Sequence, residues 1–413
     1  MPGPTASSMP SCRGIIAQPE RPRLDAYLLS QNKLLLMMIP CSLSAENHYP
    51  IQPSTLLLSC DPSQRNGNDI MYGRFPAAGS AHVGPGPALN LMAITLRSYQ
   101  PSEEQAWNQF VGTANEGTLF HRLDFLSYHG KKFAGQESHL VWCKGQTLFG
   151  VMPMAIFEEN GRRSARSPYG ASYGGPVFQS PPEYAEGTEI VYSLLERLAA
   201  LNVSVCTLTL PLSCYCAKYS ETLRLVLIEN GFACVNRDIS NAVGLPIGAP
   251  IDEIITGRAR NTVRKAEKLG IRTAHRASVA DFQVLLDKTY DRLGIKPTHT
   301  VGEFAWLCEH LPEDIYVDVA YKDDLPIAGI GFFTINKRVN SSFYLCRDPE
   351  YKESEALSLL IRDALRRSQS RGFAWFDFGT SSAGMRALRN LFMFKESFGA
   401  VGLFRETYQW EAR

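Results

Sequence analysis

The sequence predicts an α/β (α+β) fold of two similar tandem domains, each a mixed sheet flanked by helices. From Met92 onward, segments with the apolar alternation of strands are interspersed with segments of helical periodicity. The same order of elements occurs twice: two helices, a hairpin, a long helix and a short apolar strand. We therefore expect a first domain over 92–245, a basic linker helix within 246–275 and a second domain over 276–413.

Residues 1–91 differ in composition from the rest of the chain. They hold 12 of the 25 prolines, many Ser, Gly and Asn, and no sustained periodicity. Such a segment is predicted to be poorly ordered. We expect the folded protein to begin near Met92, with the upstream part a tail or an overlong reading frame. The run "KLLLMMIPCSLSA" is too short for a secretory signal, and Pro40 interrupts it.

Charge and cysteine usage exclude several classes of protein. Net charge is +1, from 42 basic and 41 acidic side chains, so we expect no DNA partner. The ten cysteines are scattered without zinc spacing, so we expect no metal and a reducing, cytoplasmic location. No apolar run approaches the ~20 residues of a membrane-spanning helix, and we expect no transmembrane segment.

The first domain begins with a strand and a capped helix. Ser102 and Gln105 have the spacing of a capping box ahead of the apolar positions of that helix. A hairpin turns at Lys144-Gly145-Gln146, and the glycine-rich loop "SPYGASYGGP" (167–176) follows it. The expected elements are strand 93–99, helix 102–113, a short helix over 119–129, helix 183–201, strand 203–210, helix 220–230 and strand 232–239.

The second domain repeats this order after the most basic stretch of the chain. That stretch, "IDEIITGRARNTVRKAEKLGI", reads as a helix ending at Gly270. Ser278 and Asp281 have the spacing of a capping box at the start of the next helix, and a hairpin turns at Asp323-Asp324. The expected elements are helix 278–294, helix 301–311, strand 341–346, helix 354–371, strand 373–379 and a last strand over about 401–410.

Five motifs occur in an order that is similar to one known family. They are "GTLFHRLDFL", "YGASYGGP", "RARNTVRKAEKLG", "FDFGTS" and "FKESFG". Together they resemble the FemAB-like branch of the GNAT acyltransferase superfamily, which includes the methicillin-resistance-type proteins, over roughly residues 95–410. The resemblance implies two GNAT-like domains and transfer of an acyl or aminoacyl group to an amine. In this family the acceptors are peptidoglycan, other envelope or polysaccharide precursors.

The resemblance leaves the acyl donor open between acyl-CoA and aminoacyl-tRNA. Bridge-forming members often carry a long helical arm in the second domain, and no such arm is visible here. GNAT enzymes hold the CoA pyrophosphate on a glycine-rich loop. The equivalent stretch, "RDPEYKESEALSLL", has Arg347 but no glycine. Backbone approach to a pyrophosphate needs glycine or an open helix start.

Lys395 and Asp377 are the predicted catalytic residues. Lys395 lies in the apolar run "FMFKESFG", and the family motif implies a place in the donor channel. There a cation could stabilise the oxyanion of acyl transfer, or the lysine could be a surface residue with its head in water. Asp377 is the one charge in the strand "WFDFG". It is either a general base or a structural carboxylate, and Glu396 is a weaker candidate base.

The predicted substrate-binding residues lie in three segments. Tyr169, Tyr173 and Gly174 belong to the glycine-rich loop, which the resemblance places at the acceptor cleft, although it could be only a tight connection. Arg260 and Arg264 share a helix face and could bind phosphates of an acceptor or of tRNA, or could be solvated. Phe394 and Phe398 would exclude water around Lys395. His121 is interpreted as a packing residue.

These features favour an acyltransferase that modifies a small-molecule or lipid-linked envelope precursor by direct attack of an amine. One alternative is an aminoacyl-tRNA-dependent transferase that builds peptidoglycan interpeptide bridges, with tRNA as a partner. The other is a non-catalytic GNAT-like module that binds a precursor.

Overall fold

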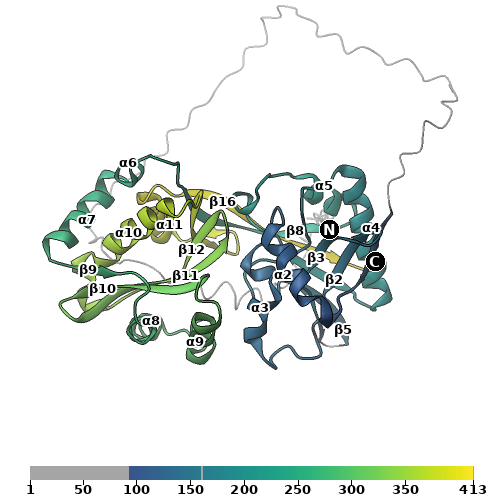
Figure 1. The fold of residues 1–413 in the computed structure, drawn as a ribbon, viewed down its shortest axis with the longest axis horizontal. Coiled ribbons are helices and arrows are strands. Elements are labelled where there is room, and N and C mark those ends of the chain that lie inside the picture. Colours follow the sequence, from purple (N-terminus) through teal and green to yellow (C-terminus); the bar gives the residue numbers. More distant parts are fainter. Residues whose placement is uncertain (1–92, 160, 413) are drawn as a thin grey trace, which may run out of the picture.

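The computed structural model describes residues 93–159 and 161–412, arranged as two lobes that lie side by side (Figure 1). The expectations for residues 1–91 lie outside the described residues. The first lobe carries helices α2 to α5 and the second carries α6 to α11. The mixed α/β class with helices on the sheets is confirmed.

The helices are α2 (Glu104–Thr113), α3 (Leu123–Leu126), α4 (Tyr184–Ala200), α5 (Thr222–Glu229), α6 (Ile251–Ile254), α7 (Gly257–Lys268), α8 (Val279–Leu293), α9 (Val301–His310), α10 (Ala356–Ser370) and α11 (Arg389–Ser397). The strands of the first lobe are β1 (Ile94–Ser98), β2 (Leu140–Lys144), β3 (Thr147–Met152), β4 (Ala155–Glu159), β5 (Arg162–Ser167), β6 (Val177–Phe178), β7 (Val205–Thr209) and β8 (Ala233–Gly244). The later strands are β9 (Arg272–Ala274), β10 (Ile315–Lys322), β11 (Leu325–Asn336), β12 (Val339–Arg347), β13 (Trp375–Thr380), β14 (Ser382–Ala383), β15 (Arg386–Ala387) and β16 (Val401–Glu411).

One sheet runs through both lobes. Within the described residues it has ten strands, in the order β4-β5-β7-β16-β8-β13-β12-β11-β10-β9. The last strand, β16, is antiparallel to both β7 and β8, and β8 in turn pairs with β13 of the second lobe. A smaller sheet, β1-β2-β3-β6, belongs to the first lobe. Because the large sheet is continuous, the domain boundaries expected near 245 and 276 stay a prediction.

Helices cover both faces of the second lobe's sheet. Helices α8 and α9 lie on one side of β10 to β12, and α7 and α10 lie on the other (Figure 1). This explains why the first seven residues of β10 are all buried. Helix α8 can approach closely because β11 has glycines beneath it: a Cβ on Gly329 would lie 2.8 Å from the ring of Phe282.

Local corrections concern the ends and the irregular segments. The capping box lies at Gln100 and Glu103 rather than at Ser102 and Gln105. The helix expected over 119–129 is a series of three short turns, two of them 3₁₀. Helix α11 and the hairpin of β4 and β5 were not expected from the sequence. Ser278 caps α8 as expected, because its side chain accepts a hydrogen bond from the backbone N–H of Asp281. The expected capping box is not completed, since the Asp281 carboxylate accepts from the hydroxyl of Tyr321 instead.

Candidate active site

A cavity lies where strands β12 and β13 separate. The two strands are parallel neighbours only where residues 339–341 face residues 375–377, although both continue beyond that point. Two strands that diverge open a gap in the sheet, and residues 341–344 and 377–380 line this one. The cavity has a volume of about 120 Å³. Loop 170–173 of the first lobe contributes a further wall, so the site lies between the lobes.

A β-bulge shapes the β12 side of the cavity. Tyr344 faces Gly331 of β11 and Ser342 faces Phe332, so Phe343 is left without an opposite residue. A bulge takes a residue out of the ladder and re-aims its backbone, and bulges are common beside active sites. Phe343 lines the cavity. Phe343 therefore lies in the cavity wall outside the regular register of the ladder.

Asp377 lies in the cavity wall with its carboxylate fully hydrogen-bonded. Oδ2 accepts from the hydroxyls of Tyr215 (2.9 Å) and Ser341 (3.0 Å). Oδ1 accepts from the hydroxyl of Ser240 (3.0 Å) and the backbone N–H of Gly379 (2.9 Å). A carboxylate offers about four lone-pair sites, and all four are used here. These contacts favour the structural interpretation of Asp377 that the sequence had left open.

Lys395 is buried in the same wall, with 2% of its surface exposed. Helix α11 buries Leu391 and Lys395 one turn apart, and Nζ donates to the carbonyls of Gly379 (2.9 Å) and Thr380 (2.7 Å). Gly379 adopts φ +71°, which turns the end of β13 so that both carbonyls meet the lysine. Burial lowers the pKa of Lys395 to about 7, and the negative charge of Asp377 opposes this shift only in part.

The glycine-rich loop contributes some of its predicted residues to the cavity. Tyr173 lines it, buried, with its ring 5.1 Å from that of Tyr215. Tyr169 lies outside it and donates to Glu137 Oε1 at 2.9 Å. Gly174 also lies outside the lining, where a Cβ would meet the backbone of Ser167 at 2.5 Å. The loop therefore presents residues 170–173 to the cavity and uses its flanks for packing.

The two phenylalanines around Lys395 face elsewhere. Phe394 lines a second, smaller pocket at the start of α10, together with Arg347 and Glu355. Phe398 is buried in the core, where its ring centroid lies 6.2 Å from that of Phe378. Helix α11 thus presents Lys395 to the cavity and Phe394 to the neighbouring pocket.

The basic helix α7 does not line the cavity. Arg260 donates to the backbone carbonyls of Asp252 and Ile255, both at 2.7 Å, and so joins α7 to the preceding helix α6. Arg264 is exposed, with a weak contact to Asn261 at 3.3 Å. A phosphate-binding role for the two arginines stays a prediction, and it would concern a surface away from Lys395.

Two other residues named from the sequence take no part in the cavity wall. His121 is fully buried, and its Nδ1 lies 2.7 Å from the hydroxyl of Thr118, as expected of a packing residue. Burial lowers its pKa to about 4. Glu396 is exposed on α11, one residue after Lys395, and does not line the cavity.

Several lining residues could not be found from the sequence. Arg405 of β16 donates to the carbonyl of Ser172 at 2.8 Å, and its guanidinium lies 5.3 Å from the ring centre of Tyr173. Tyr290 and His299 come from α8 and the segment after it. A strand arginine and isolated aromatic residues have no local signature, so only the tertiary fold brings them to the site.

Residues 93–159 and 161–412 contain no group of three or more His, Cys, Asp or Glu that could hold a metal ion. Among the same residues, no helix is both long and apolar enough to cross a membrane.

Comparison with known proteins places this site in a recognised fold. Residues 256–386 match the family model described as an acetyltransferase (GNAT) domain. The crystal structure of FemX is similar over 77% of this chain and 97% of its own, with a TM-score of 0.59 and 13% identity. L-PGS from Bacillus licheniformis matches over 76% of this chain and 92% of its own (TM-score 0.49, 11% identity). A search of curated proteins by sequence found no match.

Residues 256–386 of the second lobe thus match a GNAT acetyltransferase domain, and the chain has the fold of FemX over 77% of its length. Both findings agree with the resemblance to the FemAB-like branch of the GNAT superfamily that the sequence motifs suggested.

Proposed function

We propose that the chain is an acyltransferase that moves an acyl or aminoacyl group onto an amine of a cell-envelope or polysaccharide precursor. The reaction takes place in the cavity between β12 and β13, with the acceptor entering from the side of loop 170–173. The observation that carries this proposal is Lys395, a buried lysine with a lowered pKa in the wall of that cavity. A titratable group perturbed in this way inside a cleft is typical of a catalytic site.

The bonds of Lys395 suit it to move a proton. When neutral, its nitrogen can donate both N–H groups to the carbonyls of Gly379 and Thr380, which leaves the lone pair for the cavity. The acceptor amine attacks the acyl carbonyl, and the new C–N bond leaves a positive charge on nitrogen. Lys395 takes that proton and returns it to the leaving group as the bond from the acyl carbon breaks.

The backbone amide of Phe343 supports the other half of the step. Attack by the amine turns the carbonyl oxygen of the acyl group into an oxyanion. A hydrogen-bond donor must already be in place to stabilise that charge. The bulge places Phe343 in the cavity wall outside the ladder register, where its amide would serve as this donor. Asp377, whose oxygens are already occupied, would hold Tyr215 and the turn at Gly379 in position rather than take the proton.

The residues at the start of α10 affect which acyl donor the protein could bind. In a GNAT fold the donor in general is an acyl-CoA, whose pyrophosphate would approach this helix start. Here Glu355 takes the N-cap position with φ +57°. Three glutamates and an aspartate lie within 348–355, against one lysine. That charge disfavours a pyrophosphate. Because this negative charge disfavours acyl-CoA, aminoacyl-tRNA stays a possible acyl donor. The same charge favours a non-catalytic module that binds a precursor as a second candidate function.

Protection against heat separates these possibilities. A ligand at one hundred times its Kd stabilises a protein by about 2.7 kcal/mol. We expect acetyl-CoA or aminoacyl-tRNA to raise the Tm by several degrees, and the one that does so names the donor. The Lys395→Met protein should still be protected but should transfer nothing to an amine acceptor. Protection without transfer in the wild-type protein would favour the binding module.

A further inference from the structure

The cavity wall carries two buried side chains, each with one polar atom that has no hydrogen-bond partner within the described part of the chain. Tyr290 is 5% exposed and His299 is 4% exposed, and both line the cavity. Neither the hydroxyl of Tyr290 nor Nε2 of His299 has a hydrogen-bond partner among the described residues. Neither atom is among the buried, unpartnered side-chain atoms of that part of the chain, so both keep contact with open space. Both atoms are therefore free to bond with a polar group that enters the cavity.

The ring of His299 is held firmly. Its Nδ1 lies 2.8 Å from the hydroxyl of Tyr344, and its backbone N–H donates to the same hydroxyl at 3.2 Å. The ring stacks on Phe333, with centroids 5.5 Å apart. These contacts fix Nδ1 and leave Nε2 for the cavity. Burial lowers the pKa of His299 to about 3, so the ring is neutral at pH 7.

The surroundings of these two groups are aromatic. Tyr290 packs edge-on against Tyr344, with ring centroids 6.2 Å apart. The ring centroid of His299 lies 5.4 Å from that of Phe343. Phe120 and Phe125 of the first lobe also line the cavity. Such a wall accepts an apolar body with a few fixed polar contacts. The residues next to Tyr290 and His299 in this wall carry no charge, whereas the charged lining residues Lys395, Asp377 and Arg405 are bonded to other groups. A charged group beside Tyr290 and His299 would therefore lack a direct partner.

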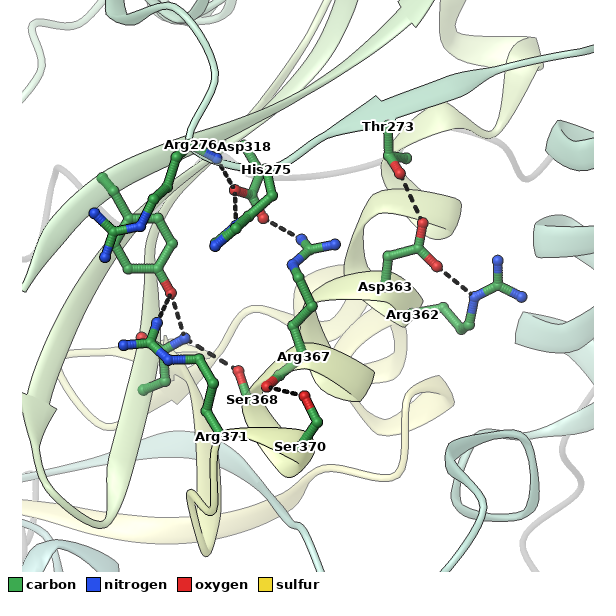
Figure 2. A network of polar contacts seen from close by, with 12 residues as sticks. Thr273, His275, Arg276, Asp318, Arg362, Asp363, Arg367, Ser368, Ser370 and Arg371 are labelled. Carbon is green, nitrogen blue, oxygen red and sulfur yellow. Dashed lines mark hydrogen bonds and ion pairs between the residues drawn. The ribbon is translucent and has the colours of Figure 1, made fainter. Parts of the chain in front are cut away.

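A polar network elsewhere in the second lobe shows what a structural cluster looks like in this protein (Figure 2). There Asp318 is fully buried, lies 2.8 Å from His275 Nδ1 and pairs with Arg367. Thr273 donates to Asp363 at 2.8 Å. The hydroxyl of Tyr316 accepts from Asn340 Nδ2 at 3.0 Å. These groups are satisfied within the protein, unlike the hydroxyl of Tyr290 and Nε2 of His299.

We propose that Tyr290 and His299 form a subsite for a neutral hydrogen-bonding group, a hydroxyl or a carboxamide, on a compact apolar part of the substrate. The subsite rests on the proposed function only in that the same cavity holds the reacting groups. The phenol and the neutral imidazole can each donate or accept, so together they hold a group that does both. The subsite thus selects among acyl or acceptor groups of similar size by their polarity.

Phenol and toluene test this proposal because they differ only in a hydroxyl and a methyl group. A cavity of about 150 Å³ accepts benzene, so rings of this size are suitable probes. Binding of each to the full chain is measured by ligand-observed NMR titration. The informative quantity is the ratio of the two Kd values, since the change from toluene to phenol isolates the hydrogen bond.

We expect Tyr290→Phe and His299→Phe each to raise the phenol-to-toluene Kd ratio about fivefold, the loss of one neutral hydrogen bond. Tyr316→Phe removes a hydroxyl that already accepts a hydrogen bond from Asn340, and it should leave the ratio unchanged. Circular dichroism checks that each variant is folded. An unchanged ratio in both cavity variants, or no binding of phenol to the wild-type protein, would overturn the proposal. Because no donor or acceptor is needed, a failure of acyl transfer leaves this test valid.

Discussion

Lys395 and Asp377 line one cavity, yet each is bonded to other groups. The lysine donates to the carbonyls of Gly379 and Thr380, and the carboxylate accepts from three hydroxyls and the amide of Gly379. A direct ion pair would have raised the pKa of the lysine, whereas burial lowers it to about 7. Because Lys395 and Asp377 are bonded to separate groups, the lysine can lose its proton near pH 7 while the carboxylate is held in place by its own hydrogen bonds.

Lys395→Met should remove transfer activity. General acid–base groups contribute about 10²- to 10⁴-fold to rates, so we expect at least a 100-fold loss of single-turnover rate. The exposed neighbour offers a matched control, because Glu396→Gln changes the same helix without touching the cavity. Transfer by Lys395→Met at the rate of Glu396→Gln would remove Lys395 from the mechanism.

The stability of the protein should depend on the protonation of Lys395. Its pKa is about 7 in the folded chain and about 10.4 when unfolded. Between these values the unfolded chain holds a proton that the folded chain has released, so stability rises with pH. Below about pH 7 both the folded and the unfolded chain hold the proton, so the contribution of Lys395 to stability no longer changes with pH.

Urea unfolding at several pH values measures this slope. Relative to Lys395→Met, the wild-type unfolding free energy should rise from about pH 7.5 to about pH 9.5, by up to about 1.4 kcal/mol per pH unit. Parallel curves for the two proteins would show that the lysine keeps an ordinary pKa.

Asp377→Asn should destabilise the protein more than the loss of a single hydrogen bond. An amide replaces one acceptor oxygen by a donor, so two of the four groups that donate to Asp377 lose their acceptor. We expect a loss of about 2–3 kcal/mol in denaturant unfolding. Tyr215→Phe removes one of the four contacts and should lose only about 1 kcal/mol. Equal effects would contradict the structural role of the carboxylate.

Arg405→Met should loosen the glycine-rich loop. Arg405 is the side chain of β16 that bonds the loop, through the carbonyl of Ser172. Without it, amides of 167–176 should exchange with deuterium up to about tenfold faster. Arg237→Met is the control, because Arg237 is half-exposed and pairs with Glu406 instead. Equal protection of the loop in both variants would show that Arg405 does not hold it.

Helical periodicity and strand alternation predicted much of the second lobe. Helices α8, α9 and α10 begin and end within two residues of their expected limits, because each has an amphipathic pattern and two have capping side chains. Helix α11 was missed because Leu388, at its N-cap, makes no capping bond. The insertion of β16 between β7 and β8 was also missed, because strand pairing across such separations leaves no local pattern.

The site was predicted in part. Lys395 and Asp377 stood out because a single charge in an apolar segment needs a reason, and both lie in the cavity wall. Tyr173 lines it too, from a loop marked by its glycines. Tyr290 and His299 could not be identified, because an aromatic residue on a helix and a histidine in a loop are usual packing residues. Their lack of partners is visible only in three dimensions.

The position of β16 has a consequence for how the chain is made. Its residues, 401–411, are synthesised after both of the strands that they separate, and they lie in the sheet between β7 and β8. Domains usually fold in order as they leave the ribosome. Here the first half would emerge with two strand edges still open. The sheet can close only after translation has passed residues 401–411.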